Sequence, residues 1–282
     1  MKDYLFNWRR LNIKRTDTVL EVGSGNRPLV RSDILCDKFP FSSYERSGYA
    51  SIVIDRPFVA ADATYLPFKD KSIDFLFCTD LAEHLEQPHK FFDECMRVAY
   101  KGAIITPSIL SERLFGWDYH TAMYEILDGK LIIHQKTDKN WGWFGETFHQ
   151  LCKDDKNFNR LVKKRTRLFR MIYEWEDKIQ YEYALSRNNE DEKWHKSSSA
   201  DQIVEQPPGG IESAKRMLKS ILSHLLRKYL LRREDIDLKS ILCCPACHGE
   251  LTYKAVGSAI ECTSCGRIYN IKNNIPLLIL NE

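Results

Sequence analysis

The stretch that decides the fold is Val19-Leu20-Glu21-Val22-Gly23-Ser24-Gly25-Asn26. Its short apolar run, bounded by turn residues, predicts a buried strand that ends at Gly23. Glycine allows a sharp turn and lets a ligand approach the backbone closely. Glu21 lies near the carboxyl end of the predicted strand, where open α/β sheets bind their ligands. A carboxylate there can accept hydrogen bonds from hydroxyl or ammonium groups and would repel a pyrophosphate, which favours a nucleoside with a cationic tail over a dinucleotide.

Strand and helix patterns alternate after this turn. Apolar runs predict further strands at 33–37, 57–62, 73–78 and 102–107, and residues 51–55 form a strand-like run. Residues 88–98 carry apolar side chains at helical spacing. The short interval after Gly25 predicts a short helix with Pro28 in its first turn. The alternation predicts an α/β fold, with a doubly wound, mostly parallel sheet and helices on both faces.

Acidic residues end several of these runs. Asp37 ends the second strand, a place where an acidic residue commonly binds ribose hydroxyls. Asp55 also ends a strand-like run and is the alternative ribose ligand, with Asp37 preferred. Asp62 ends the run at 57–62.

Composition sets broad limits on the function. The chain has 282 residues, of which 43% are hydrophobic and 29% charged, and its formal net charge of +3 is too small to indicate a partner. It contains no apolar run of about 18 residues, the length that a membrane span needs. Residues 1–10 lack the apolar segment of a signal peptide. We therefore expect a cytoplasmic protein without a transmembrane segment.

Five of the nine cysteines lie in the last 40 residues or so, which predicts a metal site. Cys244 and Cys247 form one Cys-x-x-Cys pair, and Cys262 and Cys265 form a second pair after 14 intervening residues. Two such pairs complete a tetrahedral four-thiolate site, which has no open position and is therefore structural. Cys243 adjoins the first pair and is the alternative ligand.

Residues 19–107 resemble S-adenosylmethionine-dependent methyltransferases with the doubly wound, Rossmann-like fold. The resemblance rests on Glu21-Val22-Gly23-Ser24-Gly25, on Asp37, on Ala61-Asp62-Ala63 and on Asp80-Leu81-Ala82-Glu83-His84-Leu85. It implies that S-adenosylmethionine is the cofactor. The cofactor-binding residues that it implies are Glu21, Gly23, Ser24, Gly25, Asp37, Asp62, Ala63 and Asp80.

Asp80, His84 and His120 are the candidate catalytic residues. Asp80, Glu83 and His84 follow the predicted fourth strand, where acceptor sites commonly form in such folds, and His120 lies in an aromatic segment. Either histidine could act as a general base, or could instead cap or pack. Methyl transfer depends on close positioning and often needs little acid–base help.

Residues 241–280 resemble the small zinc-ribbon activator subunit that partners tRNA, rRNA and release-factor methyltransferases, and its short bacterial relatives. The matching positions include the two cysteine pairs, Gly249, Tyr269 and Ile275-Pro276-Leu277-Leu278. The resemblance implies a structural zinc ion and a ribbon that stabilises a methyltransferase. Because both parts share one chain here, we expect an activator in cis.

We therefore expect three regions. They are a methyltransferase domain at 1–186 (core motifs at 19–107, a less clearly patterned part at 108–186), a linker with an amphipathic basic helix at 187–240, and a zinc ribbon at 241–282. The expected function is methyl transfer from S-adenosylmethionine to an acceptor that could be a small molecule or glycan precursor, an RNA or a protein. A non-catalytic adaptor with a partner-docking ribbon is the alternative.

Two basic segments bear on the choice of acceptor. Residues 163–170 and the predicted helix at 211–233 are rich in lysine and arginine. They could contact RNA or an anionic membrane surface. The preferred interpretation is a solvated helix face.

Overall fold

A computed structural model describes residues 10–42, 52–136, 142–184, 236–254 and 259–280. The predicted helix at 211–233 and most of the predicted linker lie outside these ranges. The described residues form two compact units. Unit 1 contains Cys78–His89 and the described residues from Ala103 to residue 184, and unit 2 contains those up to Phe77, Lys90–Gly102 and those from residue 236 onward.

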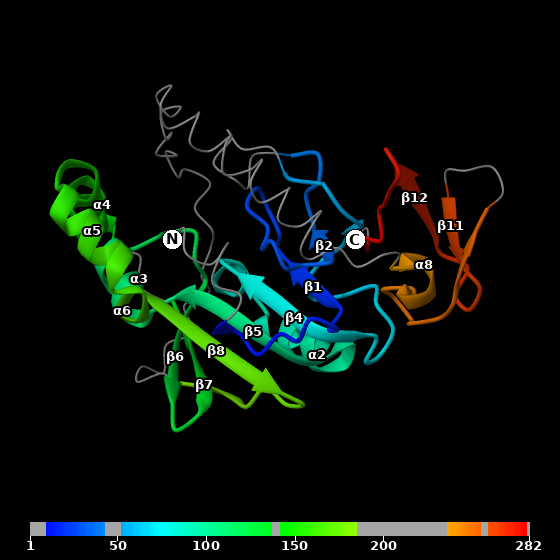
Figure 1. The fold of residues 1–282 in the computed structure, drawn as a ribbon, viewed down its shortest axis with the longest axis horizontal. Coiled ribbons are helices and arrows are strands. Elements are labelled where there is room, and N and C mark those ends of the chain that lie inside the picture. Colours follow the sequence, from blue (N-terminus) through cyan, green and yellow to red (C-terminus); the bar gives the residue numbers. More distant parts are fainter. Residues whose placement is uncertain (1–9, 43–51, 137–141, 185–235, 255–258, 281–282) are drawn as a thin grey trace, which may run out of the picture. The chain divides into compact units, whose positions relative to one another are not determined.

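A six-stranded sheet runs through the methyltransferase-like region (Figure 1). Its strands are β1 (Val19–Val22), β2 (Ile34–Asp37), β3 (Phe58–Ala60), β4 (Ile73–Thr79), β5 (Ala99–Pro107) and β8 (Arg170–Glu176), in the order β3-β2-β1-β4-β5-β8. β1 pairs with β2, and β2 with β3, in parallel. The first five strands follow the Rossmann order 3-2-1-4-5. The predicted Rossmann-like α/β fold is confirmed.

The connection from β1 to β2 differs from the prediction, because residues 23–33 contain no helix. A buried arginine holds the connection instead. Arg31 donates hydrogen bonds to Asp33 Oδ2 at 2.7 Å and to the Asp17 carbonyl at 2.6 Å. The strand-like run at 51–55 has no strand pairing over its described residues 52–55.

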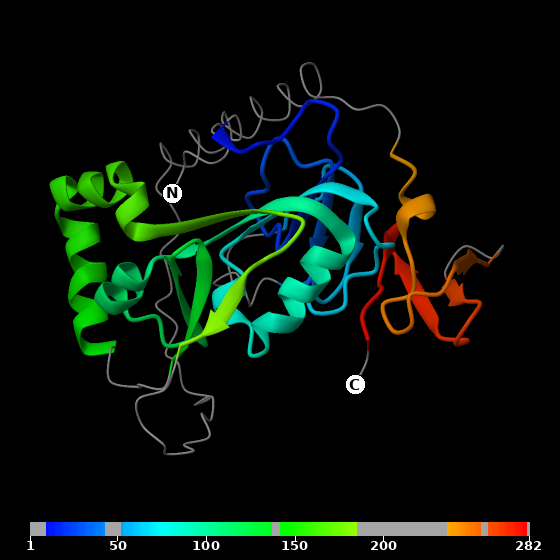
Figure 2. The same ribbon diagram turned by 90° about the horizontal axis from the view of Figure 1, so that it is seen from below.

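Helix α2 (Pro88–Val98) forms over the predicted range. Phe91, Phe92 and Cys95 are fully buried along one side of it, and Figure 2 shows the helix lying across one face of the sheet. Its polar side fastens the turn before β4. Glu94 accepts a hydrogen bond from the Leu66 N–H at 2.6 Å, and Arg97 donates to the Leu66 carbonyl at 2.7 Å.

The cysteine-rich segment folds as a small antiparallel sheet within unit 2. Its elements are α8 (Leu238–Ile241), β10 (Leu251–Tyr253), β11 (Ala259–Cys262), β12 (Ile268–Lys272) and β13 (Ile275–Pro276). The strands follow one another in the order β10-β11-β12-β13. We call this segment the ribbon.

The ribbon extends the large sheet of unit 2 at its β3 edge. The Leu278 N–H donates to the Ala60 carbonyl at 2.8 Å, and Leu277 forms a parallel bridge with Ala60. Ile275 is buried in one apolar cluster with Leu35, Phe58 and Ala60. The ribbon segment therefore satisfies the Ala60 carbonyl of β3, which an edge strand would leave unpaired.

A second line of contacts joins the start of the ribbon to residues 67–69. The Cys243 N–H donates to the Pro67 carbonyl at 3.0 Å, and the Lys69 N–H donates to the Ile241 carbonyl at 2.8 Å. Phe68 also bridges Leu242 in an antiparallel manner. The ribbon and the strand-turn region before β4 are thus bound by backbone hydrogen bonds as well as apolar packing.

Unit 1 contains a second small sheet and several helices. Its further elements are η3 (Ala82–His84), α3 (Ile109–Phe115), β6 (Ala122–Leu127), β7 (Lys130–Gln135), α4 (Gly142–Asp154), α5 (Lys156–Lys164), α6 (Thr166–Phe169) and β9 (Tyr181–Tyr183). The sheet has the order β6-β7-β9. Asp128 and Gly129 both have positive φ, which suits the tight turn of the β6–β7 hairpin. None of the helices in the described ranges is long and apolar enough to cross a membrane.

Candidate functional site

The glycine turn after β1 is fastened to the end of β2. The N–H groups of Gly23 and Ser24 donate to the Cys36 carbonyl at 2.9 and 3.2 Å. The Gly25 N–H donates to Asp37 Oδ2 at 3.0 Å. Gly23 has φ 74° and Gly25 has φ 52°, a backbone conformation that favours glycine. The structure therefore brings the predicted glycine loop and Asp37 together.

Glu21 is buried beside this turn with one carboxylate oxygen satisfied. Its Oε2 accepts hydrogen bonds from the Leu29 N–H at 2.8 Å and from Ser32 Oγ at 2.6 Å. Its Oε1 is buried and has no hydrogen-bond partner among the described residues. Burial raises the pKa of Glu21 to about 7, although Ser32 and Leu29 act in the opposite direction.

These observations fit the methionine end of S-adenosylmethionine. An ammonium group placed against Glu21 would supply the missing partner and would favour the ionised carboxylate. Ser24 Oγ is a second buried oxygen without a hydrogen-bond partner in the described part of the chain. The donor set around the glycine turn therefore suits the cofactor that the sequence predicts.

Asp37 and Asp62 are both engaged in local contacts. Asp37 Oδ1 accepts a hydrogen bond from the Phe39 N–H at 3.0 Å. Asp62 accepts from the N–H and the hydroxyl of Thr64, and forms an ion pair with Lys38 at 2.7 Å. Burial raises the pKa of Asp62, but hydrogen bonds from Lys38 and Thr64 outweigh it, so the pKa lies below its usual value. The Asp62 carboxylate offers about four lone-pair sites, which leaves room for an adenine group.

The alternative ribose ligand Asp55 has a different role in the structure. It pairs with Arg56 Nε at 2.6 Å, and Arg56 Nη1 donates to the Leu29 and Ser32 carbonyls at 2.9 and 2.8 Å. Asp55 therefore helps an arginine to support the connection that follows the glycine turn. Asp37 lies at the end of β2, as predicted, and its role as the ribose ligand stays a prediction. Ala63 lies one residue beyond Asp62 and is buried.

Asp80, His84 and His120 all belong to unit 1. Asp80 follows β4 in the left-handed conformation, with φ 54°, and its Oδ1 pairs with Arg170 at 2.5 Å. The rings of His84 and His120 meet edge to face with their centroids 4.7 Å apart. The structure therefore brings the two candidate histidines together.

Both histidines are held in the neutral form. Burial is the main cause that lowers the pKa of His120 to about 3, and the nearby Lys136 adds to it. Desolvation of its ring and the nearby His120 lower the pKa of His84 to about 4, although the residue as a whole keeps contact with solvent. A neutral imidazole has a free lone pair at neutral pH, but a pKa of 3–4 makes it a weak proton acceptor.

Two charged residues beside the histidines, Glu112 and Lys136, had no signal in the sequence, whereas Glu83 lies in the predicted acceptor segment. Glu83 and Glu112 are each 1% exposed, and Lys136 is 8% exposed. His120 Nδ1 lies 2.5 Å from Glu112 Oε1, and Lys136 lies 3.5 Å from Glu112 Oε2.

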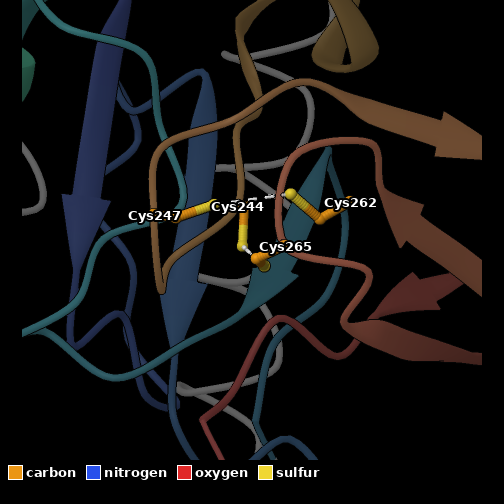
Figure 3. A group of neighbouring side chains, drawn as sticks. All are labelled: Cys244, Cys247, Cys262 and Cys265. Atoms are coloured by element: carbon orange, nitrogen blue, oxygen red, sulfur yellow. Dashed lines mark hydrogen bonds between the residues drawn. The ribbon is translucent and has the colours of Figure 1, made fainter.

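The four ribbon cysteines converge as predicted. Figure 3 shows the side chains of Cys244, Cys247, Cys262 and Cys265 pointing toward one another. Their sulfur atoms all lie within 4.8 Å of one another, with Cys244–Cys265 at 3.7 Å and Cys247–Cys262 at 3.5 Å. A tetrahedral zinc with Zn–S bonds of about 2.3 Å sets its sulfurs about 3.8 Å apart. The cluster is therefore compatible with zinc.

Groups around the cluster support thiolate ligands. Backbone N–H groups of Gly249 and Arg267 face Cys247 and Cys265. A Cβ on Gly249 would lie 2.3 Å from Ser264 Oγ, so the loop leaves no space for a side chain there. Cys243 is not in the cluster, because it lies beside Arg97 of α2.

Comparisons with known protein families match both parts of the chain. A methyltransferase domain model matches residues 44–106, and a Trm112p-like protein model matches residues 235–274. A UPF0434 protein of Proteus mirabilis is 38% identical over 48 residues, which cover 17% of this chain and 81% of that protein. The chain belongs to the family of this UPF0434 protein, and it carries a methyltransferase domain and a Trm112p-like domain.

The other relatives also match only part of the chain. The chain is 43% identical over 47 residues to an uncharacterized methyltransferase of Mycolicibacterium vanbaalenii, and the match covers 17% of this chain and only 18% of that relative's length. A methyltransferase structure from Thermotoga maritima is 20% identical, with 39% of this chain and 52% of that chain covered and a TM-score of 0.30. A complex of the Haloferax volcanii Trm112 methyltransferase activator with a methyltransferase gives 22% identity, 38% and 49% coverage and a TM-score of 0.28.

Proposed function

We propose that the chain is an S-adenosylmethionine-dependent methyltransferase whose Trm112p-like domain stabilises the cofactor-binding sheet in cis. The observation that carries the proposal is the pairing of Leu277 and Leu278 with Ala60 at the end of β3. β3 lies beside β2, which ends at Asp37, and its last residue is two positions before Asp62. The ribbon thus buries the strand edge that precedes one predicted cofactor ligand.

The residues around β1 and β2 have defined roles in this proposal. S-adenosylmethionine would supply a methyl group bound to a sulfonium. An acceptor nucleophile attacks the carbon of that methyl group, and S-adenosylhomocysteine is the leaving group. Glu21 would accept a hydrogen bond from the ammonium group through its unpartnered Oε1. Gly23, Ser24 and Gly25 would let the cofactor approach the backbone, while Asp37 would bind the ribose.

Asp62 and Ala63 are proposed to lie at the adenine end. The Asp62 carboxylate is fixed by Thr64 and Lys38, so it presents its remaining lone pairs in one orientation. Asp80, His84 and His120 are proposed to act on the acceptor or cofactor side. Because the two imidazoles are neutral, they would position a group by hydrogen bonding or coordination rather than collect its proton.

The exposed basic residues of unit 1 bear on the acceptor class, which experiments on the full chain can determine. Lys163, Lys164, Arg165 and Arg167 are exposed on α5 and α6, and α5 contains no buried residue, as expected of a solvated face. An RNA acceptor predicts affinity that falls steeply with salt. A small-molecule or protein acceptor predicts a weaker salt response.

Calorimetry with S-adenosylhomocysteine tests the proposal against the adaptor alternative. A methyltransferase should bind the product with one site per chain. A non-catalytic adaptor should not bind it. Incubation of the protein with labelled S-adenosylmethionine and pools of small molecules, RNA or protein would then identify the acceptor class.

A further inference from the structure

A second group of metal-ligating side chains lies in unit 1, apart from the ribbon cysteines. Glu83, His84 and His120 each offer one ligand atom, and these atoms all lie within 4.8 Å of one another. Two ligands of one zinc-sized ion with bonds of about 2.1 Å are about 3.4 Å apart. Small side-chain rotations would bring ligand atoms that lie up to 4.8 Å apart to this separation.

The imidazole of His120 is oriented as metal-ligating histidines usually are. Its Nδ1 lies 2.5 Å from Glu112 Oε1, and Glu112 Oε2 pairs with Lys136. A carboxylate that accepts the Nδ1–H fixes the tautomer and leaves the Nε2 lone pair free for a cation. One ring nitrogen of His84 likewise hydrogen-bonds to the backbone of Tyr119, which leaves the other nitrogen to bind an ion.

Glu83 carries the observation that points to a missing ligand. It is 1% exposed, and its Oε2 has no hydrogen-bond partner in the described part of the chain. A buried unpaired carboxylate oxygen is costly unless a donor or a cation satisfies it. The neighbouring carboxylates already have cations, since Asp80 pairs with Arg170 and Glu112 pairs with Lys136.

The backbone around Glu83 is fixed by contacts to the segment that carries His120. The Glu83 carbonyl accepts hydrogen bonds from the N–H and the hydroxyl of Thr121 at 2.7 and 3.1 Å. The Tyr124 hydroxyl donates to the Ala82 carbonyl at 2.8 Å. These contacts bind η3 to the start of β6, so the ligand residues are held in place before any ion arrives.

The geometry points to a divalent-cation site formed by Glu83, His84 and His120. Two imidazoles and one carboxylate suit cations from manganese to zinc better than calcium or magnesium. Three protein ligands leave open coordination positions, which an oxygen atom of water or of a bound molecule would fill. His84 is exposed, so an ion can enter from solvent. The inference does not depend on methyl transfer.

Binding of Mn²⁺ to the full chain with zinc in its ribbon tests the inference. Mn²⁺ prefers oxygen and nitrogen ligands and should leave the thiolates to zinc. Loss of the free-ion electron paramagnetic resonance signal measures binding directly. We expect one Mn²⁺ per chain, and we expect Glu83→Gln and His120→Ala to weaken it at least tenfold. Glu112→Gln should weaken it about 10–100-fold, as outer-shell changes do.

His134→Ala is the matched control. His134 also pairs with a glutamate, Glu125, at 2.7 Å, but it lies on the β6–β7 hairpin outside the cluster. This variant should bind Mn²⁺ as the wild type does. Elemental analysis after dialysis against Zn²⁺ gives a second readout, with one ion fewer per chain in Glu83→Gln than in the wild type.

Glu83→Gln keeps the shape of the side chain, so it separates loss of a ligand from loss of the fold; an unchanged circular dichroism spectrum should accompany its loss of binding. A wild-type chain that binds neither Mn²⁺ nor Zn²⁺ beyond the ribbon ion would overturn the inference. Equal binding by the wild type, Glu83→Gln and His120→Ala would also overturn it.

Discussion

The Leu278 N–H donates a hydrogen bond of 2.8 Å to the carbonyl of Ala60, so the Trm112p-like domain pairs directly with an edge of the methyltransferase sheet. Two domains that occur as separate family models are thereby joined through backbone pairing within unit 2. The pairing lies two residues before Asp62. Stability of the ribbon and affinity for the cofactor should therefore change together.

Leu278→Ala should test this coupling. Leu278 is fully buried, and truncation of a buried leucine costs about 2–5 kcal/mol of the free energy of unfolding. We expect a lower denaturation midpoint and weaker binding of S-adenosylhomocysteine. Ile268→Ala is the control, because Ile268 is 63% exposed on β12 and its truncation should change stability by about 0.5 kcal/mol or less. Wild-type stability and affinity in Leu278→Ala would contradict activation in cis.

The ribbon should lose its ion when one thiolate is removed. Cys262→Ser should lower the zinc content by about one ion per chain, because a structural site needs all four ligands. Its circular dichroism and denaturation midpoint should change with the metal content, since folding of such small domains depends on the ion. Cys152→Ser is the control, as Cys152 lies outside the cluster. Equal zinc content in both variants would show that the cluster is not the zinc site.

Stability should fall as the pH rises toward 7, through Glu21. The pKa of this buried carboxyl rises from 4.5 to about 7 in the fold, so the folded state holds the proton that the unfolded state releases. The contribution of Glu21 to the free energy of unfolding is fully present below about pH 4.5 and is lost by about pH 7. It amounts to roughly 3 kcal/mol. Glu21→Gln should remove this slope, so the stability difference between wild type and variant should shift in favour of the variant between pH 5 and pH 8. Parallel pH profiles of the two proteins would contradict the assignment.

The same ionisation should control cofactor affinity. An ammonium group binds the ionised form of Glu21, which is the minor form below pH 7 in the free protein. Affinity for S-adenosylhomocysteine should therefore rise between pH 6 and pH 8 in the wild type. Glu21→Gln should bind more weakly and show no such rise, and calorimetry at each pH measures both.

Local patterns predicted much of the fold. The helix at 88–98 forms over its predicted range because Phe91, Phe92 and Cys95 mark one face at helical spacing. The strands that end at Val22 and Asp37 also form where the apolar runs place them. Such features depend on residues close in sequence, which a single chain displays.

Features that depend on distant residues were not predictable. The helix expected at Pro28 is replaced by a loop that Arg31 and Arg56 support through carbonyl groups, and no periodic pattern indicates such contacts. The pairing of Leu278 with Ala60 joins residues more than 200 positions apart. Glu112 lies on α3, eight residues before His120, which is outside any helix, and nothing in its sequence context marks it as a partner.

The most direct test of the central claim is a calorimetric titration of the full chain with S-adenosylhomocysteine at pH 8. The wild type and Glu146→Gln, which changes an exposed glutamate on α4, should each bind one molecule per chain with equal affinity. Glu21→Gln should bind markedly more weakly. Absence of binding in the wild type, or equal affinity in all three proteins, would contradict the account.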